Sequence, residues 1–257
     1  MFLSLQTKRD RRIAGVIVAL SLAAAIFLRQ ASLPVVETGS WGLSFRQDGQ
    51  TPTGTASQAV LDEFGAAYIG DTTEPVIYLT FDAGYENGYT AQILDTLAAH
   101  DVHAAFFLVG NYLEKEPELV RRMVSEGHTV GNHTYHHVQM PREGALICGT
   151  ELDMTNQLIR EITGETPEIM RPPFGQWSRS LEEQIEMIPV SWDVDPLDWE
   201  TPDAGIVANR ILSDVENGDI ILLHDSYATS VEAALRVIDV LQAEGMEFVA
   251  AEDLLFD

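Results

Sequence analysis

Two histidines four residues apart are the first residues in this chain that could do chemistry. His133 and His137 can bind one metal ion if the segment turns like a helix, because positions i and i+4 share a face. Imidazole nitrogen is a good ligand for zinc, cobalt or nickel. Such a pair is a surface coincidence about as often as a ligand pair, so it predicts a metal site only together with other signals. His136 cannot face the same way as both neighbours, and we interpret it as structural or substrate-facing.

A carboxylate closes the apolar run Val76–Leu79. Asp82 lies in the string Thr80–Gly84, at the end of an expected strand and beside a glycine turn, where chemistry is expected. Ala83 follows it, at the position where a metal-binding sequence of this kind would carry a second carboxylate. The string therefore predicts a metal site that is short of one ligand.

A proline-rich loop follows another short apolar segment. Pro172 and Pro173 fix the backbone in an extended loop and supply no N–H, so any donor function falls on Phe174 and Gly175. A rigid loop that aims one backbone amide is what an oxyanion site needs. Arg171 opens this loop at a strand end, and we expect it to pair with a strand-end carboxylate rather than to lie on the surface.

Two later strings supply an acid and a histidine. His224 ends the apolar run 220–223, and a carboxylate such as Asp198 can hold it in one tautomer and raise its pKa, so that it acts as a general acid. The alternative for His224 is a buried histidine with satisfied hydrogen bonds. Trp199 and Phe174 could form an apolar wall for a sugar ring, although tryptophan is more often simply core.

The elements that must position these residues alternate between strand and helix. Expected strands cover 76–81, 104–109, 129–130, 168–171, 189–192, 220–223 and 248–249, and expected helices cover 89–100, 117–126, 145–163, 181–186, 202–216 and 231–243. This regular alternation predicts an α/β fold with a parallel sheet, and about seven units predict closure into a distorted (β/α) barrel. In such a barrel reactive residues lie at the carboxyl ends of strands, which is where the residues above fall.

Taken together, the five strings resemble the polysaccharide deacetylase family, also called the NodB-homology domain or carbohydrate esterase family 4, over about residues 74–255. The resemblance implies a metal-dependent deacetylase of the NodB-homology fold. The resemblance implies that Asp82 is the catalytic base, that Arg171 orients this base and that the Phe174 amide binds the oxyanion. It also implies that His224 is the acid, with Asp198 as its carboxylate partner, and that His133 and His137 are metal ligands.

The first string departs from the family pattern T-F-D-D-G at Ala83, where the family carries a metal-binding aspartate. Three outcomes follow: a weakly held ion with an extra water, Asp82 as a third ligand, or no metal. We favour the first, because both histidines would otherwise lack a purpose. The extended string, residues 80–90, looks like the branch that deacetylates muramic acid in peptidoglycan, as in spore-cortex δ-lactam formation. The later strings look like general peptidoglycan and chitooligosaccharide deacetylases.

The N-terminus differs in composition from the rest of the 257-residue chain. The first thirty residues hold five of the fifteen basic residues. An uncharged apolar run of about 16 residues, 13–28, follows the first four of them and is slightly shorter than the roughly 20 residues that span a bilayer. This pattern predicts a signal peptide or an uncleaved membrane anchor, with the body outside the cytoplasmic membrane. The remaining chain carries 10 basic against 39 acidic residues, which disfavours nucleic acid as a partner. The single cysteine, Cys148, is interpreted as a small buried hydrophobe.

The predicted organisation is a signal peptide or anchor over 1–29, a linker over 30–73 and a deacetylase domain over 74–257. The predicted function is hydrolysis of N-acetyl groups on an extracytoplasmic glycan, namely muramic acid or glucosamine residues of peptidoglycan. The alternatives are a non-catalytic glycan-binding module of the same fold, and a deacetylase that acts on chitooligosaccharide or xylan.

Overall fold

The computed structural model describes residues 66–251 of the chain. The predicted signal or anchor, and the linker up to residue 65, lie outside the described residues. Within residues 66–251, no helix has the length and apolar character that crossing a membrane requires. The division of the chain at residues 29 and 73 stays a prediction.

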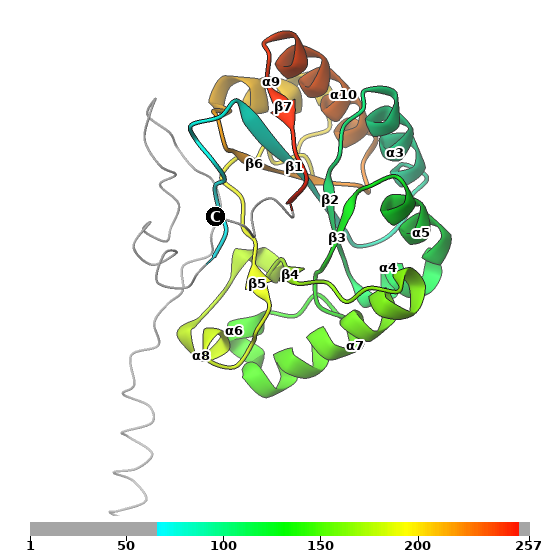
Figure 1. The fold of residues 1–257 in the computed structure, drawn as a ribbon, viewed down its shortest axis with the longest axis vertical. Helices are drawn as coiled ribbons and strands as arrows, with labels where there is room; N and C mark the ends of the chain where they lie inside the picture. The colour runs from blue at the N-terminus through cyan, green and yellow to red at the C-terminus, as the bar shows by residue number, and fades with distance from the viewer. Residues whose placement is uncertain (1–65, 252–257) are drawn as a thin grey trace, which may run out of the picture. The chain divides into compact units, whose positions relative to one another are not determined.

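A parallel sheet of seven strands organises the described residues (Figure 1). The strands are β1 (Val76–Ala83), β2 (Ala105–Leu108), β3 (Thr129–Asn132), β4 (Ile169–Met170), β5 (Ile188–Pro189), β6 (Ile220–His224) and β7 (Glu247–Phe248). Their order is β5-β4-β3-β2-β1-β6, and β7 pairs with the start of β1. The predicted α/β class and parallel sheet are confirmed, but the named strands form a half-barrel. Among the described residues, the segment that follows β5 pairs with strand β6 only through isolated bridges, such as that of Val194 with Ile221.

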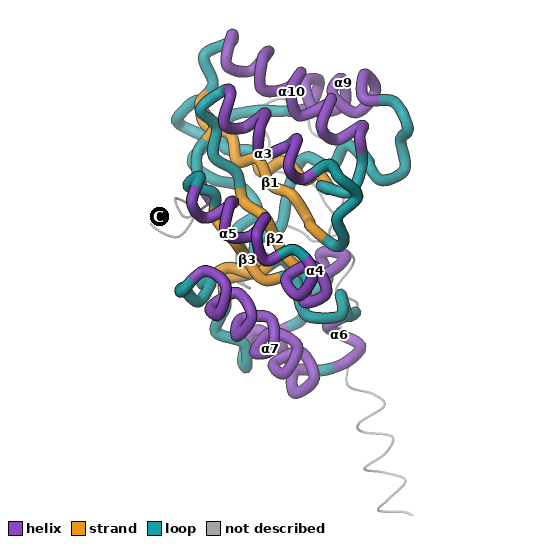
Figure 2. The backbone as a smooth tube through the Cα atoms, turned by 90° about the vertical axis from the view of Figure 1, so that its right-hand side faces the viewer, coloured by secondary structure: helices purple, strands orange, loops and turns teal. Residues whose placement is uncertain are grey.

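The helices pack mainly on the outer face of this sheet. They are α3 (Thr90–Ala99), α4 (Gly110–Lys115), α5 (Pro117–Ser125), α6 (Met140–Glu143), α7 (Ala145–Thr163), the 3-10 turn η1 (Pro173–Gly175), α8 (Arg179–Glu182), α9 (Ala204–Asp214) and α10 (Ala228–Ala243). In Figure 2, α3, α4 and α5 lie in front of β1, β2 and β3. Local signals explain several ends: Pro117 starts α5, Asp203 caps α9 by accepting from the backbone N–H groups of its first turn, and Gly164 ends α7 in the left-handed conformation.

Strand alternation divides the core on the two faces of β1 into two clusters. In β1, Ile77 and Leu79 pack among the helices, whereas Tyr78 faces the inside of the half-barrel. Asp82 follows the parity of Tyr78 and lies on the inner face. Ala83 is fully buried in the helix-facing cluster. Two adjacent residues of one string therefore have different surroundings, because successive strand residues point to opposite faces.

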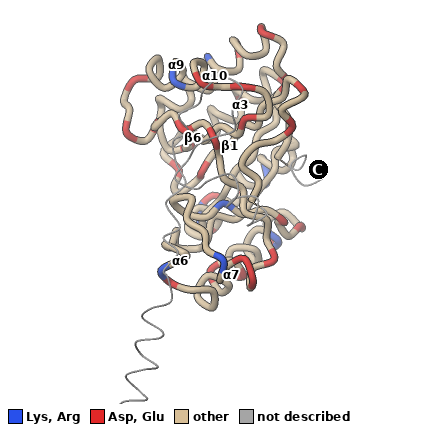
Figure 3. The backbone as a smooth tube through the Cα atoms, turned by 90° about the vertical axis from the view of Figure 1, so that its left-hand side faces the viewer, with Lys and Arg blue, Asp and Glu red and all other residues tan. Residues whose placement is uncertain are grey.

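Acidic residues outnumber basic ones in the described part of the chain. Figure 3 shows Asp and Glu spread over several helices and loops, whereas Lys and Arg are few. Cys148 is buried in a third cluster beneath α7, and its thiol donates to the carbonyl oxygen of Met140 over 3.2 Å. Burial raises the pKa of this thiol to about 11, so Cys148 is confirmed as a buried, non-ionised side chain.

Candidate active site

Arg171 and Asp82 form a buried ion pair at the carboxyl ends of β4 and β1. Arg171 is 0% exposed, and its Nη1 donates to Asp82 Oδ1 over 2.9 Å and to Thr80 Oγ1 over 2.8 Å. Its remaining donors reach the carbonyl oxygens of Val190, over 3.2 Å, and Ser191, over 3.0 Å. Arg171 therefore holds one oxygen of Asp82 and leaves Oδ2 free of this contact.

The charges around Asp82 keep it ionised. Burial alone would raise its pKa, but the neighbouring His133 and the Arg171 guanidinium outweigh burial and lower the pKa below the ordinary aspartate value. Of these two, Arg171 is the permanent charge, so we assign the net direction to it. The result is a carboxylate that is available to accept a proton at neutral pH.

His224 and Asp198 form the second charged pair. His224 Nδ1 donates to Asp198 Oδ1 over 2.8 Å, and the backbone N–H of His224 donates to Asp198 Oδ2 over 2.7 Å. Ser230 Oγ also donates to Oδ2, over 2.5 Å. Because a carboxylate only accepts, Nδ1 must carry a proton, and Nε2 is the position where the ring can gain or lose one.

The environment of His224 favours its cationic form. Burial would lower the pKa of the imidazole, but the hydrogen bond and charge of Asp198, together with the charges of Asp82 and Asp195, raise it to about 9. His224 is therefore an imidazolium at neutral pH and can give up a proton from Nε2.

The sheet places these two pairs side by side. In the parallel register of β1 and β6, Asp82 is the Cα partner of His224. Neighbouring strands are about 4.8 Å apart, so an ionised carboxylate and a protonated imidazole stand next to each other at the same edge of the sheet. The strings that carry Asp82, Arg171, Asp198 and His224 thus meet at one place.

The two histidines of the H-x3-H string also meet there, but not through a helical turn. Residues 133–137 form an irregular loop after β3, so the helix-like turn that the sequence reasoning gave as the condition for a shared ion is not formed. Thr134 has φ 61° and His137 has φ 54°, and these left-handed residues curl the chain. The ring centroids of His133 and His137 consequently lie 4.8 Å apart.

Both imidazoles are in the state that binds metals. His133 Nδ1 donates to the Arg171 carbonyl oxygen over 2.7 Å, so Nε2 carries the lone pair and lies 3.4 Å from Asp82 Oδ2. Burial lowers the pKa of His133 below its ordinary value and that of His137 to about 4, which keeps both rings neutral. The pair fits a divalent cation as two of its ligands.

A third protein ligand is not in place. Among residues 66–251, no group of three or more His, Cys, Asp or Glu side chains is arranged to hold a metal ion. The position after Asp82 offers only the buried methyl group of Ala83. The donor set is therefore two histidines, with Asp82 beside them and already engaged by Arg171.

A groove of about 480 Å³ opens over these groups. Its lining includes Asp82, His133, His137 and His224, together with residues that the sequence reasoning did not single out: Tyr85, Asn111, Tyr135, Ser226 and Tyr227. Tyr85 lies in the string that carries Asp82, and Tyr135 lies between His133 and His137, so the positions of these two tyrosines were available signals for this set. The tyrosines provide apolar faces and hydroxyl groups of the kind that sugar-binding grooves use.

The proline-rich loop borders the groove through Phe174. The ring of Phe174 is 48% exposed and lies edge-on to His137, with centroids 4.7 Å apart. Phe174 has φ 61°, and the next two amides of the loop, those of Gly175 and Gln176, donate to the carbonyl oxygens of Pro172 and Pro173. Pro172 is extended, but residues 173–175 form the 3-10 turn η1, so the extended loop that the two prolines predicted is wrong for these residues. The Gly175 amide is engaged within the turn, which leaves Phe174 as the candidate donor.

Trp199, in contrast, is 52% exposed on the surface, so the alternative that it belongs to the core is wrong. His136 lines the groove and is paired with Glu151, through Nδ1 and Oε1 at 2.8 Å.

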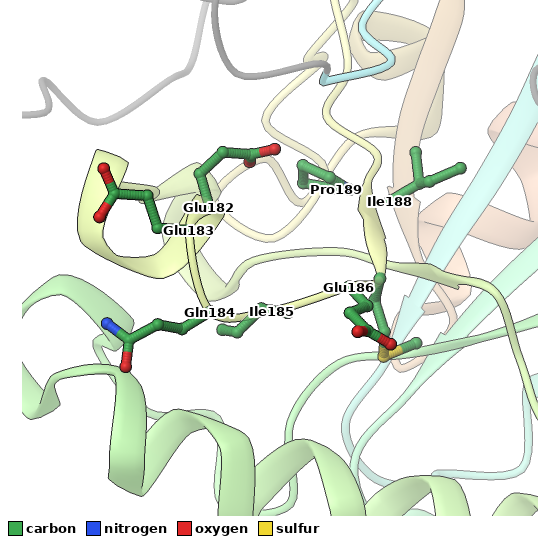
Figure 4. Close-up of a pocket in the computed structure, with 8 residues that line it drawn as sticks. Glu182, Glu183, Gln184, Ile185, Glu186, Ile188 and Pro189 are labelled. Carbon is green, nitrogen blue, oxygen red and sulfur yellow. The ribbon is translucent and has the colours of Figure 1, made fainter.

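A second hollow, of about 440 Å³, lies along residues 182–189 between α8 and β5 (Figure 4). Figure 4 shows that the side chains of Glu183 and Glu186 lie on different sides of it and do not converge. The groove above Asp82 is therefore the better candidate for chemistry.

Comparison with known proteins agrees with this geometry. A family model described as polysaccharide deacetylase matches residues 69–190. The peptidoglycan-N-acetylmuramic acid deacetylase PdaA of Bacillus subtilis is 33% identical over 236 residues, which cover 89% of this chain and 90% of that protein. This chain belongs to the polysaccharide deacetylase family. Deacetylases of this family are metal-dependent, which agrees with the paired neutral histidines.

Two further comparisons extend the assignment to the polysaccharide deacetylase family. The solved structure of Bacillus subtilis PdaA, a family 4 carbohydrate esterase, superposes with a TM-score of 0.79 at 33% identity, covering 86% of this chain and 97% of that one. The peptidoglycan-N-acetylglucosamine deacetylase PgdA of Listeria monocytogenes serotype 1/2a is 35% identical over 182 residues, which cover 71% of this chain and 39% of that protein. The half-barrel is thus the fold of this family.

Proposed function

We propose that this polysaccharide deacetylase hydrolyses N-acetyl groups on the muramic acid or glucosamine residues of peptidoglycan, outside the cytoplasmic membrane. One observation carries the proposal: a base and an acid with opposite pKa shifts are cross-strand neighbours. Asp82 is ionised and His224 is protonated in the same pH range, because Arg171 lowers one pKa and Asp198 raises the other. Hydrolysis of an amide needs both groups at once, one for the water and one for the leaving nitrogen.

In the proposed mechanism, Asp82 accepts a proton from the attacking water through its carboxylate, while Arg171 holds that carboxylate in place. The backbone N–H of Phe174 donates to the acetamide oxygen as negative charge develops there. His224 then gives its Nε2 proton to the departing amine, and Asp198 stabilises the imidazolium until that transfer. Phe174 and Trp199 are assigned to the substrate-binding surface, whereas the predicted Pro173 is buried and contributes through the loop that carries Phe174.

Zinc, cobalt or nickel would be held by His133 and His137. When bound, such an ion supplies Lewis acidity toward the acetamide oxygen. We propose weak binding, because the family's aspartate ligand is replaced by Ala83. Calorimetric titration of the metal-free protein tests this, and an absence of binding at millimolar zinc, cobalt and nickel would contradict it.

The substrate is proposed from the relatives and from the groove. PdaA and PgdA are named for muramic acid and glucosamine deacetylation, respectively, and both match this chain at 33% identity or more. The predicted N-terminal signal or anchor would deliver the domain to the side of the membrane where peptidoglycan lies. Sugar rings would stack on the groove's tyrosines and on Phe174.

The deciding experiment measures acetate release from purified peptidoglycan, followed by mass spectrometry of the muropeptides to identify the deacetylated sugar. Wild type should release acetate, and His224→Ala should be slower by at least about 100-fold, since general acid catalysis contributes on that order. Equal, background-level release by both proteins would support the alternative of a glycan-binding module without turnover. Release from chitooligosaccharide or acetylated xylan, but not from peptidoglycan, would favour the other alternative.

A further inference from the structure

A buried glutamate on α7 holds the middle of the histidine loop. Glu151 is 8% exposed, and its Oε2 accepts from the backbone N–H of His136 over 2.7 Å, while its Oε1 accepts from the His136 ring over 2.8 Å. Both oxygens of one carboxylate are thus used on one residue of the loop. Hydrogen bonds to a charged acceptor are stronger than neutral ones, so this contact is a firm anchor.

The loop needs such an anchor, because its backbone is strained. Thr134 and His137 both adopt positive φ without being glycine, and each such residue costs on the order of 1 kcal/mol or more unless its surroundings impose the conformation. The N–H of Thr134 is bound by Asn132 Oδ1 over 2.7 Å, and the N–H of Val138 is bound by Thr134 Oγ1 over 3.2 Å. The Glu151 contact is placed between the two strained residues.

Helix α7 holds the loop at a second point as well. The side-chain amide of Asn132, the last residue of β3, donates to the Leu152 carbonyl oxygen over 3.0 Å and to Asn156 Oδ1 over 2.7 Å. The start and the middle of the segment 132–137 are therefore both attached to this one helix. The position of α7 sets where the backbone between His133 and His137 runs.

We propose that Glu151 is a positioning residue that fixes the two metal-binding histidines relative to each other. Its carboxylate binds His136 and not the imidazoles of His133 or His137, so it acts through the backbone of His136. The inference rests on the proposed role of these histidines as metal ligands. Residues that orient metal ligands commonly change metal affinity by about 10 to 100-fold when they are replaced.

The test replaces Glu151 with glutamine, which keeps the shape of the side chain. Its carbonyl oxygen can accept one of the two N–H bonds, but its amide nitrogen cannot accept the other. The matched control is Glu161→Gln on the same helix, because Glu161 is exposed and only accepts from Gln157, over 2.8 Å. Zinc titration of the metal-free proteins should show about 10-fold weaker binding for Glu151→Gln and unchanged binding for Glu161→Gln.

Hydrogen exchange of the metal-free proteins provides a second readout, one that requires no bound metal. Amides of residues 133–138 should exchange faster in Glu151→Gln than in the control, whereas amides in the middle of α7 should not. Faster exchange along the whole helix with unchanged zinc affinity would mean that Glu151 only stabilises α7, and the proposal would be wrong. Equal zinc affinity in both variants together with equal loop exchange would also overturn it.

The two proposals can fail separately. If wild type binds no zinc, the metal assignment fails, and loop exchange alone decides whether Glu151 positions the histidines. If Glu151→Gln does not fold, Asn156→Ala replaces it, because Asn156 is only partly buried and its Oδ1 is one of the two acceptors on α7 that bind the Asn132 amide. That variant should also weaken zinc binding and speed exchange at residues 132–134, and wild-type behaviour in both assays would refute the role of α7.

Discussion

Asp198→Asn should lower the pKa of His224 and thereby move the alkaline limit of activity to lower pH. In the wild type, the carboxylate of Asp198 accepts from Nδ1 and helps raise this pKa to about 9. Asparagine has nearly the same size but no charge, and its amide nitrogen cannot accept the Nδ1 proton. Burial, which lowers the pKa, is then opposed mainly by Asp82 and Asp195. The pKa of His224 should fall toward the ordinary value of about 6.5.

The size of the effect follows from the two pKa values. A fall from about 9 to about 6.5 corresponds to roughly 3 kcal/mol of lost preference for the protonated ring. At pH 8 the protonated fraction would drop from about 90% to about 3%, so activity should fall by up to about 30-fold on this account. At pH 6 both proteins are largely protonated, and the same substitution should cost less than about 2-fold through protonation.

The assay is the pH dependence of acetate release between pH 5.5 and 9.5, with the His224 ring titrated by NMR in the same proteins. Any loss of ring orientation would lower activity by the same factor at all pH values. The ratio of the activity at pH 8 to the activity at pH 6, compared between variant and wild type, therefore isolates the protonation effect. A variant that loses the same factor at both pH values, with an unchanged His224 pKa, would refute the reasoning. The stability contribution has the matching sign: because the folded pKa is raised, it is present below about pH 6.5 and is lost as pH rises through about 9.

Three further substitutions test other parts of the site. Ala83→Asp should bind zinc about 10 to 100-fold more tightly than wild type. Without metal this variant should be less stable than wild type, since the new carboxylate is buried. Ala83→Asn is the isosteric control, and equal zinc affinity in all three proteins would refute the missing-ligand argument. Arg171→Met should lower the free energy of unfolding in urea by about 3 to 5 kcal/mol, because Asp82 becomes an unpaired buried charge; a loss below about 1 kcal/mol would contradict this. Trp199→Ala should raise KM with little change in kcat, and an unchanged KM would remove Trp199 from the substrate surface.

Much of the fold was predictable from local sequence patterns. The helix expected over 145–163 is the observed α7, and β1 begins at the expected Val76, because apolar periodicity and turn residues act locally. Helix α4 was missed, since Gly110 and Asn111 at its start are poor helix formers and its burial comes from tertiary packing. Closure into a barrel was over-predicted, because β4 and β5 are only two residues long and pairing beyond Pro189 is reduced to single bridges.

The sequence by itself singled out the candidate residues for chemistry. Asp82, Arg171 and His224 stand out because they interrupt or end apolar runs, and strand ends are where a parallel sheet presents reactive groups. The proline pair likewise predicted a restricted backbone at 171–175, since proline restricts the backbone wherever it occurs, but only the structure shows that residues 173–175 form a 3-10 turn.

Only the tertiary structure decided how these groups act on one another. The pairing of Asp82 with Arg171 joins residues 89 positions apart, and the neutral state of His133 depends on burial that no local pattern reports. From the sequence, His133 and His137 could share an ion only through a helix-like turn. In the structure, positive φ values at Thr134 and His137 and the contact of Glu151 with His136 bring the two rings together without one. Charge, burial and hydrogen bonding depend on distances between segments, so the protonation states on which the proposed chemistry rests exist only once the chain has folded.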